Sequence, residues 1–95
     1  MKVLWSPSAL ADLEDAWAWV AQDDPDAAGR LIARLLQAVE QLSTSIVDGP
    51  VCTLRSGAEV RKWRVGAYAV YYQRTGEAFR VVRVYHQRRR PIVVP

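Results

Sequence analysis

Cationic side chains, with aromatic ones among them, gather toward the end of the chain, and these residue types suit contact with an anion. Arginine and lysine neutralise phosphate groups, while aromatic rings stack on nucleic-acid bases. The candidate contacts to a target or a nucleic acid are Arg61, Lys62, Arg64, Arg83, His86, Arg88, Arg89 and Arg90. An acidic protein partner would suit the same cations. The three consecutive arginines at 88–90 could instead form a solvated surface that contacts no partner and only favours solubility.

Acid–base chemistry would depend on the single histidine, His86. Histidine is the residue type whose ordinary pKa lies nearest neutrality, so His86 could act as a general acid beside the arginines. The alternative is a structural imidazole held by hydrogen bonds. Cys52 and His86 could formally make a nucleophilic pair, but a lone cysteine beside an apolar loop is usually inert.

Metal and cofactor chemistry have no visible basis in the sequence. With one histidine and one cysteine, no set of His, Cys, Asp and Glu has the spacing of metal ligands. No glycine-rich phosphate loop is present either. We therefore expect no metal and no cofactor.

Length and composition indicate one small folded domain over residues 1–95. Of the 95 residues, 51% are hydrophobic, which argues against disorder. The apolar runs are too short to cross a bilayer, and the first residues lack the long apolar segment of a secretion signal. A single cysteine suits the reducing cytosol. We therefore expect a cytoplasmic protein with no membrane partner.

The formal net charge of +3 conceals two halves of opposite sign. Residues 1–50 carry three cations and eight carboxylates, which gives −5. Residues 51–95 carry ten cations and two carboxylates, which gives +8. A basic half of this size predicts an anionic partner, and nucleic acid and an acidic protein are the two candidates.

Two helices are expected in the acidic half. Residues 2–5 are typical of a short strand, and Ser6 and Pro7 then suit a helix start, with Ser6 as the cap. An apolar stripe with helical spacing follows, formed by Leu10, Leu13, Trp17 and Val20. Asp24 and Pro25 begin the second helix. The short link between the two helices predicts an antiparallel hairpin.

Beyond residue 58 the apolar spacing falls toward two, which is typical of strands. Strands are predicted at 60–65, 68–73 and 78–85, after a loop at 43–57. The order β-α-α-β-β-β predicts an α+β fold, with the helical hairpin packed on one face of a small, mainly antiparallel sheet. Because one hairpin covers only one face, the other face or its rim is left for solvent or a partner.

Trp19 falls opposite the apolar stripe of the first helix, so we expect its side chain to be exposed. An exposed tryptophan often marks a site for a partner protein. The alternative is that Trp19 packs under the loop at 43–57 or against the C-terminal segment.

Four segments in this order resemble the RelE/ParE superfamily of toxins from bacterial type II toxin–antitoxin systems. They are WSPSALADLE at 5–14, DPDAA at 24–28, VRKWRVGAYAVYY at 60–72 and VYHQRR at 84–89. The resemblance covers residues 3 to about 91. The loop at 43–57 departs from the superfamily pattern, since it contains Asp48-Gly49-Pro50. The long helices, the Trp-Ser-Pro start and the Val-Gly-x-Tyr turn favour the ParE-like branch.

The resemblance implies one of two activities. ParE-like members inhibit DNA gyrase and have no recognised catalytic set, whereas RelE-like members cleave mRNA on the ribosome without a metal. In a RelE-like ribonuclease, Arg61 and Arg83 could hold the phosphate and His86 could act as the acid, with Glu59 or Tyr85 as the base. The tyrosine that often follows the histidine is absent, because position 87 is Gln.

Either branch implies a cognate antitoxin as a partner, and the basic half would suit its acidic and apolar side chains. The candidate antitoxin contacts are Trp19, Tyr71, Arg80 and Tyr85. We expect a gyrase inhibitor neutralised by an antitoxin. The alternatives are a ribosome-dependent endoribonuclease and a basic nucleic-acid-binding module.

Overall fold

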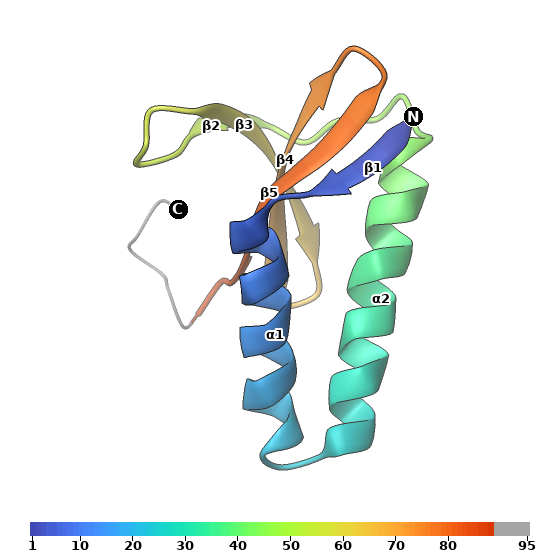
Figure 1. Ribbon diagram of the computed structural model, residues 1–95, viewed down its shortest axis with the longest axis vertical. Helices are drawn as coiled ribbons and strands as arrows, with labels where there is room; N and C mark the ends of the chain where they lie inside the picture. Colours follow the sequence, from blue (N-terminus) through green and yellow to red (C-terminus); the bar gives the residue numbers. More distant parts are fainter. Residues whose placement is uncertain (89–95) are drawn as a thin grey trace.

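The computed structural model describes residues 1–88, which form two helices beside one five-stranded sheet (Figure 1). The elements are β1 (Lys2–Trp5), α1 (Pro7–Ala21), α2 (Pro25–Ser43), β2 (Val51–Thr53), β3 (Glu59–Val65), β4 (Tyr68–Thr75) and β5 (Ala78–His86). The strand order is β1-β5-β4-β3-β2. Strand β1 runs parallel to β5, and the other neighbouring pairs are antiparallel. The predicted α+β class and the helical hairpin are therefore confirmed.

Both helix starts follow from side-chain caps that the sequence predicts. The Ser6 hydroxyl accepts a hydrogen bond from the Ala9 amide at 3.0 Å and donates one to the Val82 carbonyl at 2.7 Å. It thus caps α1 and ties it to β5. At α2, Oδ1 of Asp24 accepts from the amides of residues 26 and 27, each at 3.1 Å. These bonds satisfy amides that have no partner within the helix.

The buried face of α1 differs from the predicted apolar stripe. Leu10 and Trp17 are 49% and 47% exposed, whereas Ala9, Asp12 and Ala16 are buried. Small alanines let the helix approach the sheet closely, so the apolar stripe lies to one side of the contact. The spacing therefore predicted the helix correctly but the wrong centre for its buried face.

The predicted loop at 43–57 contains a short strand that sequence reasoning missed. Strand β2 pairs with β3 at the edge of the sheet, with Cys52 opposite Val60. Three residues are too few to show an alternating pattern, and this strand forms because β3 offers it a hydrogen-bonding edge. The other strands agree with their predicted ranges to within two residues at each end.

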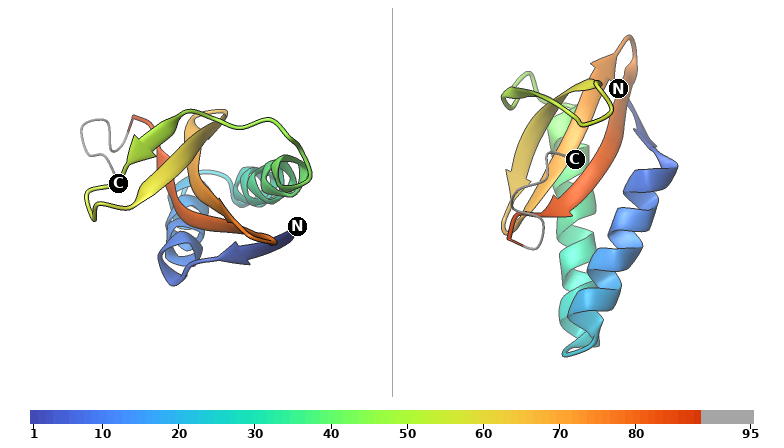
Figure 2. Two further views of the ribbon diagram at one scale, coloured as in Figure 1. Left: turned by 90° about the horizontal axis from the view of Figure 1, so that it is seen from above. Right: turned by 90° about the vertical axis from the view of Figure 1, so that its left-hand side faces the viewer.

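The sheet has a helix-side face, which contacts α1 and α2, and an open face turned away from them (Figure 2). The largest fully buried side chains of the helix-side core are Tyr72, Phe79, Leu35, Val39, Val70 and Val81. A second, smaller cluster contains Leu54, Val60, Ala69, Tyr71 and Tyr85. On the strands these residues alternate with the helix-side ones, so the open face buries apolar side chains of its own.

Candidate functional site

The pairing of the strands places four cations on the open face. On β3, Lys62 and Arg64 alternate with Trp63 and Val65, which pack in the helix-side core. On β5, Arg80 lies between Phe79 and Val81, which are buried in the helix-side core. Arg83 of β5 pairs with Tyr71 of β4, which belongs to the open-face cluster. Strand alternation therefore confines Lys62, Arg64, Arg80 and Arg83 to one side of the sheet.

Arg83 is held by a carboxylate from α1. Its Nε and Nη2 donate to Oδ2 and Oδ1 of Asp12 at 2.8 and 2.9 Å, and the Val84 amide donates to the same Oδ2 at 2.9 Å. The hydrogen bond that Arg83 donates to Asp12 is the main reason why the pKa of Arg83 is raised above its ordinary value. This two-pronged pair joins α1 to β5 just beyond the end of β1, where the β5 backbone needs another partner.

A strand irregularity determines where Arg83 lies. The register of β4 against β5 shifts between Tyr71 and Tyr72, which pair with Arg83 and Val81. Val82 is therefore the additional residue of a bulge, and its carbonyl accepts the hydrogen bond from Ser6. Bulges reorient the side chains that follow them, and here the reoriented residue is the one bound by Asp12.

Cations and aromatic rings alternate across the open face. The Arg83 guanidinium lies 4.5 Å from the ring centre of Tyr85, and the Tyr85 and Tyr71 rings meet edge to face at 6.2 Å. Nζ of Lys62 lies 6.0 Å from the Tyr71 ring centre. Such cation–π contacts orient the charged groups without neutralising them.

A groove of about 650 Å³ runs beside these residues, and we call it the basic groove. Three of its lining residues are arginines: Arg80 and Arg83 from β5, and Arg55 from the connection between β2 and β3. The remaining lining residues are Ser6, Pro7, Ser8, Leu54, Ser56, Val82 and Tyr85. No carboxylate lines it among the described residues, so the groove suits an anionic ligand.

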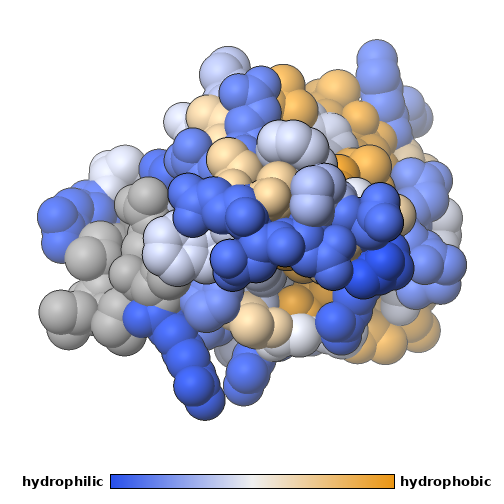
Figure 3. All heavy atoms as spheres, turned by 90° about the horizontal axis from the view of Figure 1, so that it is seen from below, coloured by the Kyte–Doolittle hydropathy of each residue, from blue (hydrophilic) through white to orange (hydrophobic). Residues whose placement is uncertain are grey.

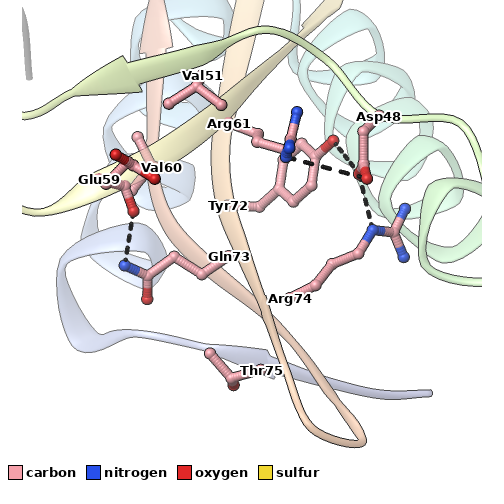
Figure 4. Close-up of a pocket in the computed structure, with 9 residues that line it drawn as sticks. All are labelled: Asp48, Val51, Glu59, Val60, Arg61, Tyr72, Gln73, Arg74 and Thr75. Carbon is pink, nitrogen blue, oxygen red and sulfur yellow. Dashed lines mark hydrogen bonds and ion pairs between the residues drawn. The ribbon is translucent and has the colours of Figure 1, made fainter.

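Arg61 lies elsewhere, in a polar site at the opposite side of the sheet (Figure 4). Its Nη1 donates to the Gly49 carbonyl at 2.8 Å, and its Nε lies 3.9 Å from Oδ2 of Asp48. Oδ1 of Asp48 also accepts from the Tyr72 hydroxyl at 2.9 Å and from Nε of Arg74 at 2.8 Å. The hydrogen bond from Arg74 is the main reason why the pKa of Asp48 is lowered.

Arg74 is a structural cation that sequence reasoning missed. Its Nη2 donates to the carbonyls of Leu42 and Val47 at 2.8 and 3.1 Å, and its Nη1 donates to the Ser43 carbonyl at 3.4 Å. It therefore binds the last carbonyls of α2, where the helix dipole favours a cation. The hydrogen-bonded Arg61, Asp48 and Arg74 together anchor the segment after α2 to the sheet.

Sequence reasoning also missed Asp12, although a signal was available. Ala9, Asp12 and Ala16 are spaced by three and four residues, which puts a carboxylate on a helix face otherwise formed by small residues. A buried carboxylate needs a cation or several donors, so this spacing predicts a partner from the sheet. For Arg74 the sequence contains no comparable signal, because its contacts are with residues of α2 and the following segment.

His86 lies at the end of β5, where its ring meets the Tyr68 ring edge to face at 5.0 Å. Its Nδ1 accepts a hydrogen bond from the Arg88 amide at 3.1 Å. Arg88 is exposed, whereas Arg89 and Arg90 lie outside the described residues. Cys52 belongs to the open-face cluster, away from the Tyr68 side, and burial raises the pKa of its thiol.

The structure does not bring Arg61, Arg83 and His86 into one site. Arg61 pairs with Tyr72 and His86 with Tyr68, so they lie four residues apart along β4. At about 3.3 Å per residue, that is roughly 13 Å along the strand. Arg83 is on the other face of the sheet and bound to Asp12.

The four candidate antitoxin contacts come from the helical layer and from the open face. Trp19 on α1 is 54% exposed, as its position opposite the apolar stripe predicts. Arg80 is exposed and lines the basic groove. Tyr71 and Tyr85 are buried in the open-face cluster, so little of either side chain is accessible to a partner.

Comparison with known proteins places this fold in a family. Residues 3–91 match the family described as the ParE toxin of the type II toxin–antitoxin system parDE. The chain belongs to the ParE toxin family. It is thus a ParE-type toxin of a type II toxin–antitoxin system, and the RelE/ParE resemblance is confirmed.

Two further comparisons agree with this family. Over 59 residues the chain is 34% identical to the "Putative toxin Y4kP" of Sinorhizobium fredii (strain NBRC 101917 / NGR234), and this match spans 62% of each protein. A solved structure entitled "Chromosomal ParDE TA system from P. aeruginosa" contains a chain with a TM-score of 0.75 and 18% identity. That match covers 90% of this chain and 95% of the other, and it shows a shared fold.

Neither helix within residues 1–88 of this ParE-type toxin is both long and apolar enough to cross a membrane. No group of three or more His, Cys, Asp and Glu side chains in this part of the chain could hold a metal ion.

Proposed function

We propose that this ParE-type toxin inhibits DNA gyrase and is neutralised in the cytoplasm by a cognate antitoxin. The observation that carries the proposal is the match of residues 3–91 to the ParE toxin family. The ParE-like motifs in the sequence, from the Trp-Ser-Pro start to the Val-Gly-x-Tyr turn, support the same branch.

The placement of the ribonuclease candidates also supports a gyrase inhibitor over a RelE-like enzyme. Cleavage of mRNA by its own 2′-hydroxyl needs an acid, a base and cations around one phosphate. Arg61 and His86 lie at distant points along the sheet, and Arg83 faces the other way in its pair with Asp12. The three side chains would need large rearrangements to surround one phosphate.

The antitoxin is proposed to contact the toxin through exposed surface near Trp19 and Arg80. Toxin partners of this kind commonly carry acidic and apolar side chains, which suit an exposed indole and a guanidinium. Tyr71 and Tyr85 would contribute through the little surface that they expose. If the gene beside this one encodes the antitoxin, its co-expression should relieve any growth arrest that expression of the toxin causes.

A supercoiling assay tests the gyrase proposal. Purified toxin is added to gyrase, ATP and relaxed plasmid, and supercoiled product is measured on a gel with and without excess co-purified antitoxin. We expect the toxin to reduce supercoiling and the antitoxin to restore it. Supercoiling that stays unchanged over a wide range of toxin concentrations would reject the proposal.

A parallel assay with translating ribosomes tests the alternative. Cut mRNA in this assay would favour a ribonuclease, and His86→Ala should then slow cleavage by about 10²-fold if His86 is the acid. We expect the message to remain intact.

A further inference from the structure

The two halves of opposite charge become two faces of the folded toxin. Carboxylates are concentrated on the helical hairpin, at Glu14, Asp15, Asp23, Asp24, Asp26 and Glu40. The tip of the hairpin, which faces the viewer in Figure 3, is covered mainly by hydrophilic residues. The open face of the sheet has the opposite character, since Lys62, Arg64, Arg80 and Arg83 lie there. An anion would therefore approach the open face and be repelled by the hairpin.

Two of the three guanidinium groups of the basic groove have no partner among the described residues. Within residues 1–88, Arg55 and Arg80 make no ion pair or hydrogen bond, and both side chains are exposed. They come from different elements, so the fold and not sequence proximity places them on one groove. Unpaired arginines that line one groove repel each other, and a bound anion would relieve that repulsion.

Arg83, which also lines the basic groove, is held in a fixed orientation. Asp12 engages its Nε and Nη2 from one side, and the guanidinium also interacts with the Tyr85 side chain. Asp12 is 7% exposed and offsets most of the Arg83 charge, so the net positive charge of the groove comes mainly from Arg55 and Arg80. Arg83 is thus held in a fixed place beside the exposed side chains of Arg55 and Arg80.

The lining of the groove favours phosphate over a peptide. Protein segments gain most of their affinity from apolar anchors in desolvated pockets. Leu54 and Tyr85 are only 6% and 8% exposed, so they offer little surface to such anchors. Guanidinium groups match the geometry of phosphate oxygens, and Lys62 and Arg64 continue the row of cations along the same face.

We propose that the basic groove binds the phosphodiester backbone of duplex DNA, with Arg55 and Arg80 contacting phosphates on either side of the fixed Arg83. This contact requires no base readout, because backbone binding is independent of sequence. It is distinct from gyrase inhibition and needs no gyrase, and the antitoxin, which is proposed to contact Arg80 as well, would compete with it. In the cell it would bring the toxin to the DNA on which gyrase acts.

The test measures binding of the purified toxin to a short fluorescein-labelled DNA duplex by fluorescence anisotropy, over a series of salt concentrations and without gyrase. Arg80→Ala and Arg55→Ala remove cations from the groove. Arg30→Ala is the matched control, because Arg30 is an exposed arginine on α2 whose recorded partner is Asp24 at 3.9 Å. It changes the net charge equally but leaves the groove intact.

We expect affinity to fall steeply with salt, and each groove variant to weaken binding by roughly five- to tenfold and reduce the salt slope by about 1. Arg30→Ala should change affinity by less than about twofold. Equal effects of Arg30→Ala and Arg80→Ala would overturn the proposal, as would the absence of binding at low salt. Tighter binding of a labelled polyglutamate peptide than of the duplex would assign the groove to an acidic protein instead.

The supercoiling assay separates this proposal from the proposed function. If DNA binding fails but supercoiling is still inhibited, the groove proposal is rejected and the gyrase proposal stands. If the toxin binds DNA through the groove without affecting supercoiling, the gyrase proposal is rejected and the groove proposal stands.

Discussion

At the scale of single residues, Asp12 links the two layers of the toxin. Its carboxylate accepts two hydrogen bonds from Arg83 and one from the Val84 amide, and its side chain is 6% exposed. A buried carboxylate without these donors would carry a large desolvation cost. The same pair orients Arg83 on the open face, so a residue of the helix determines the geometry of the basic groove.

Removal of this carboxylate should destabilise the fold. Asp12→Ala leaves Arg83 unpaired and the Val84 amide without its acceptor, and we expect the free energy of unfolding to fall by about 2–4 kcal/mol. The lower end is favoured because the Arg83 side chain is 29% exposed and water can solvate it.

Urea denaturation measures this effect, with Asp15→Ala as the control, since Asp15 is exposed on the same helix. We expect the control to change the free energy of unfolding by less than about 0.5 kcal/mol. The stability of Asp12→Asn should lie between those of Asp12→Ala and Asp15→Ala, because an amide oxygen can still accept a hydrogen bond. Equal stabilities for Asp12→Ala and Asp15→Ala would contradict this interpretation of Asp12.

At the scale of elements, the segment between α2 and β2 is held closely against the sheet. Arg74 binds the terminal carbonyls of α2, and the Gly49 amide donates to the Tyr72 hydroxyl at 2.9 Å. Gly49 also lies so close to the backbone of β3 that an added Cβ would overlap the Lys62 carbonyl. Glycine is therefore required here for close approach.

Two glycine-to-alanine substitutions should therefore change the stability of the fold in opposite directions. Gly49→Ala forces the segment away from β3 and should lower the free energy of unfolding by about 2 kcal/mol or more. Gly29→Ala lies within α2 with no atom near the new methyl group, and it should raise stability by about 0.5–1 kcal/mol.

Thermal denaturation of both variants beside the parent protein provides the measurement. A Gly49→Ala protein as stable as the parent would show that the segment can move away from β3 without cost. If Gly29→Ala were destabilising, the surface of α2 at that position would have a contact that the structure does not show.

At the scale of the whole molecule, the predicted single domain implies that both layers unfold together. The helical hairpin and the sheet share one core, in which Leu35 and Val39 of α2 meet Tyr72 and Phe79 of the sheet. The open-face cluster is too small to be stable alone, because small apolar clusters bury little surface. We therefore expect cooperative unfolding of residues 1–88 as one unit.

Four tryptophans make this expectation testable. Trp5 lies on β1, Trp17 and Trp19 on α1, and Trp63 on β3, so fluorescence samples both layers. Urea transitions followed by tryptophan fluorescence and by far-ultraviolet circular dichroism should coincide. A sheet signal that is lost before the helical signal would indicate two units that unfold separately.

Local patterns in the sequence were sufficient to predict most of the helices and strands and their order along the chain. The Ser6 and Asp24 caps, the helical spacing of apolar residues and the alternation after residue 58 predict two helices and three of the later strands. These signals depend on neighbours within a few residues, so they can be recognised without the fold. The same segments carried the resemblance to the toxin family.

The tertiary structure alone decided which faces meet and which charges pair. Asp12 and Arg83 are 71 residues apart in the chain, and Arg74 lies about 30 residues from the carbonyls that it binds. Helical spacing cannot show whether Leu10 or Asp12 faces the sheet, because that orientation depends on the packing of distant elements. Strand alternation sorts cations between two faces, but only the sheet order and the bulge at Val82 place Arg80 and Arg83 on the groove that Arg55 completes.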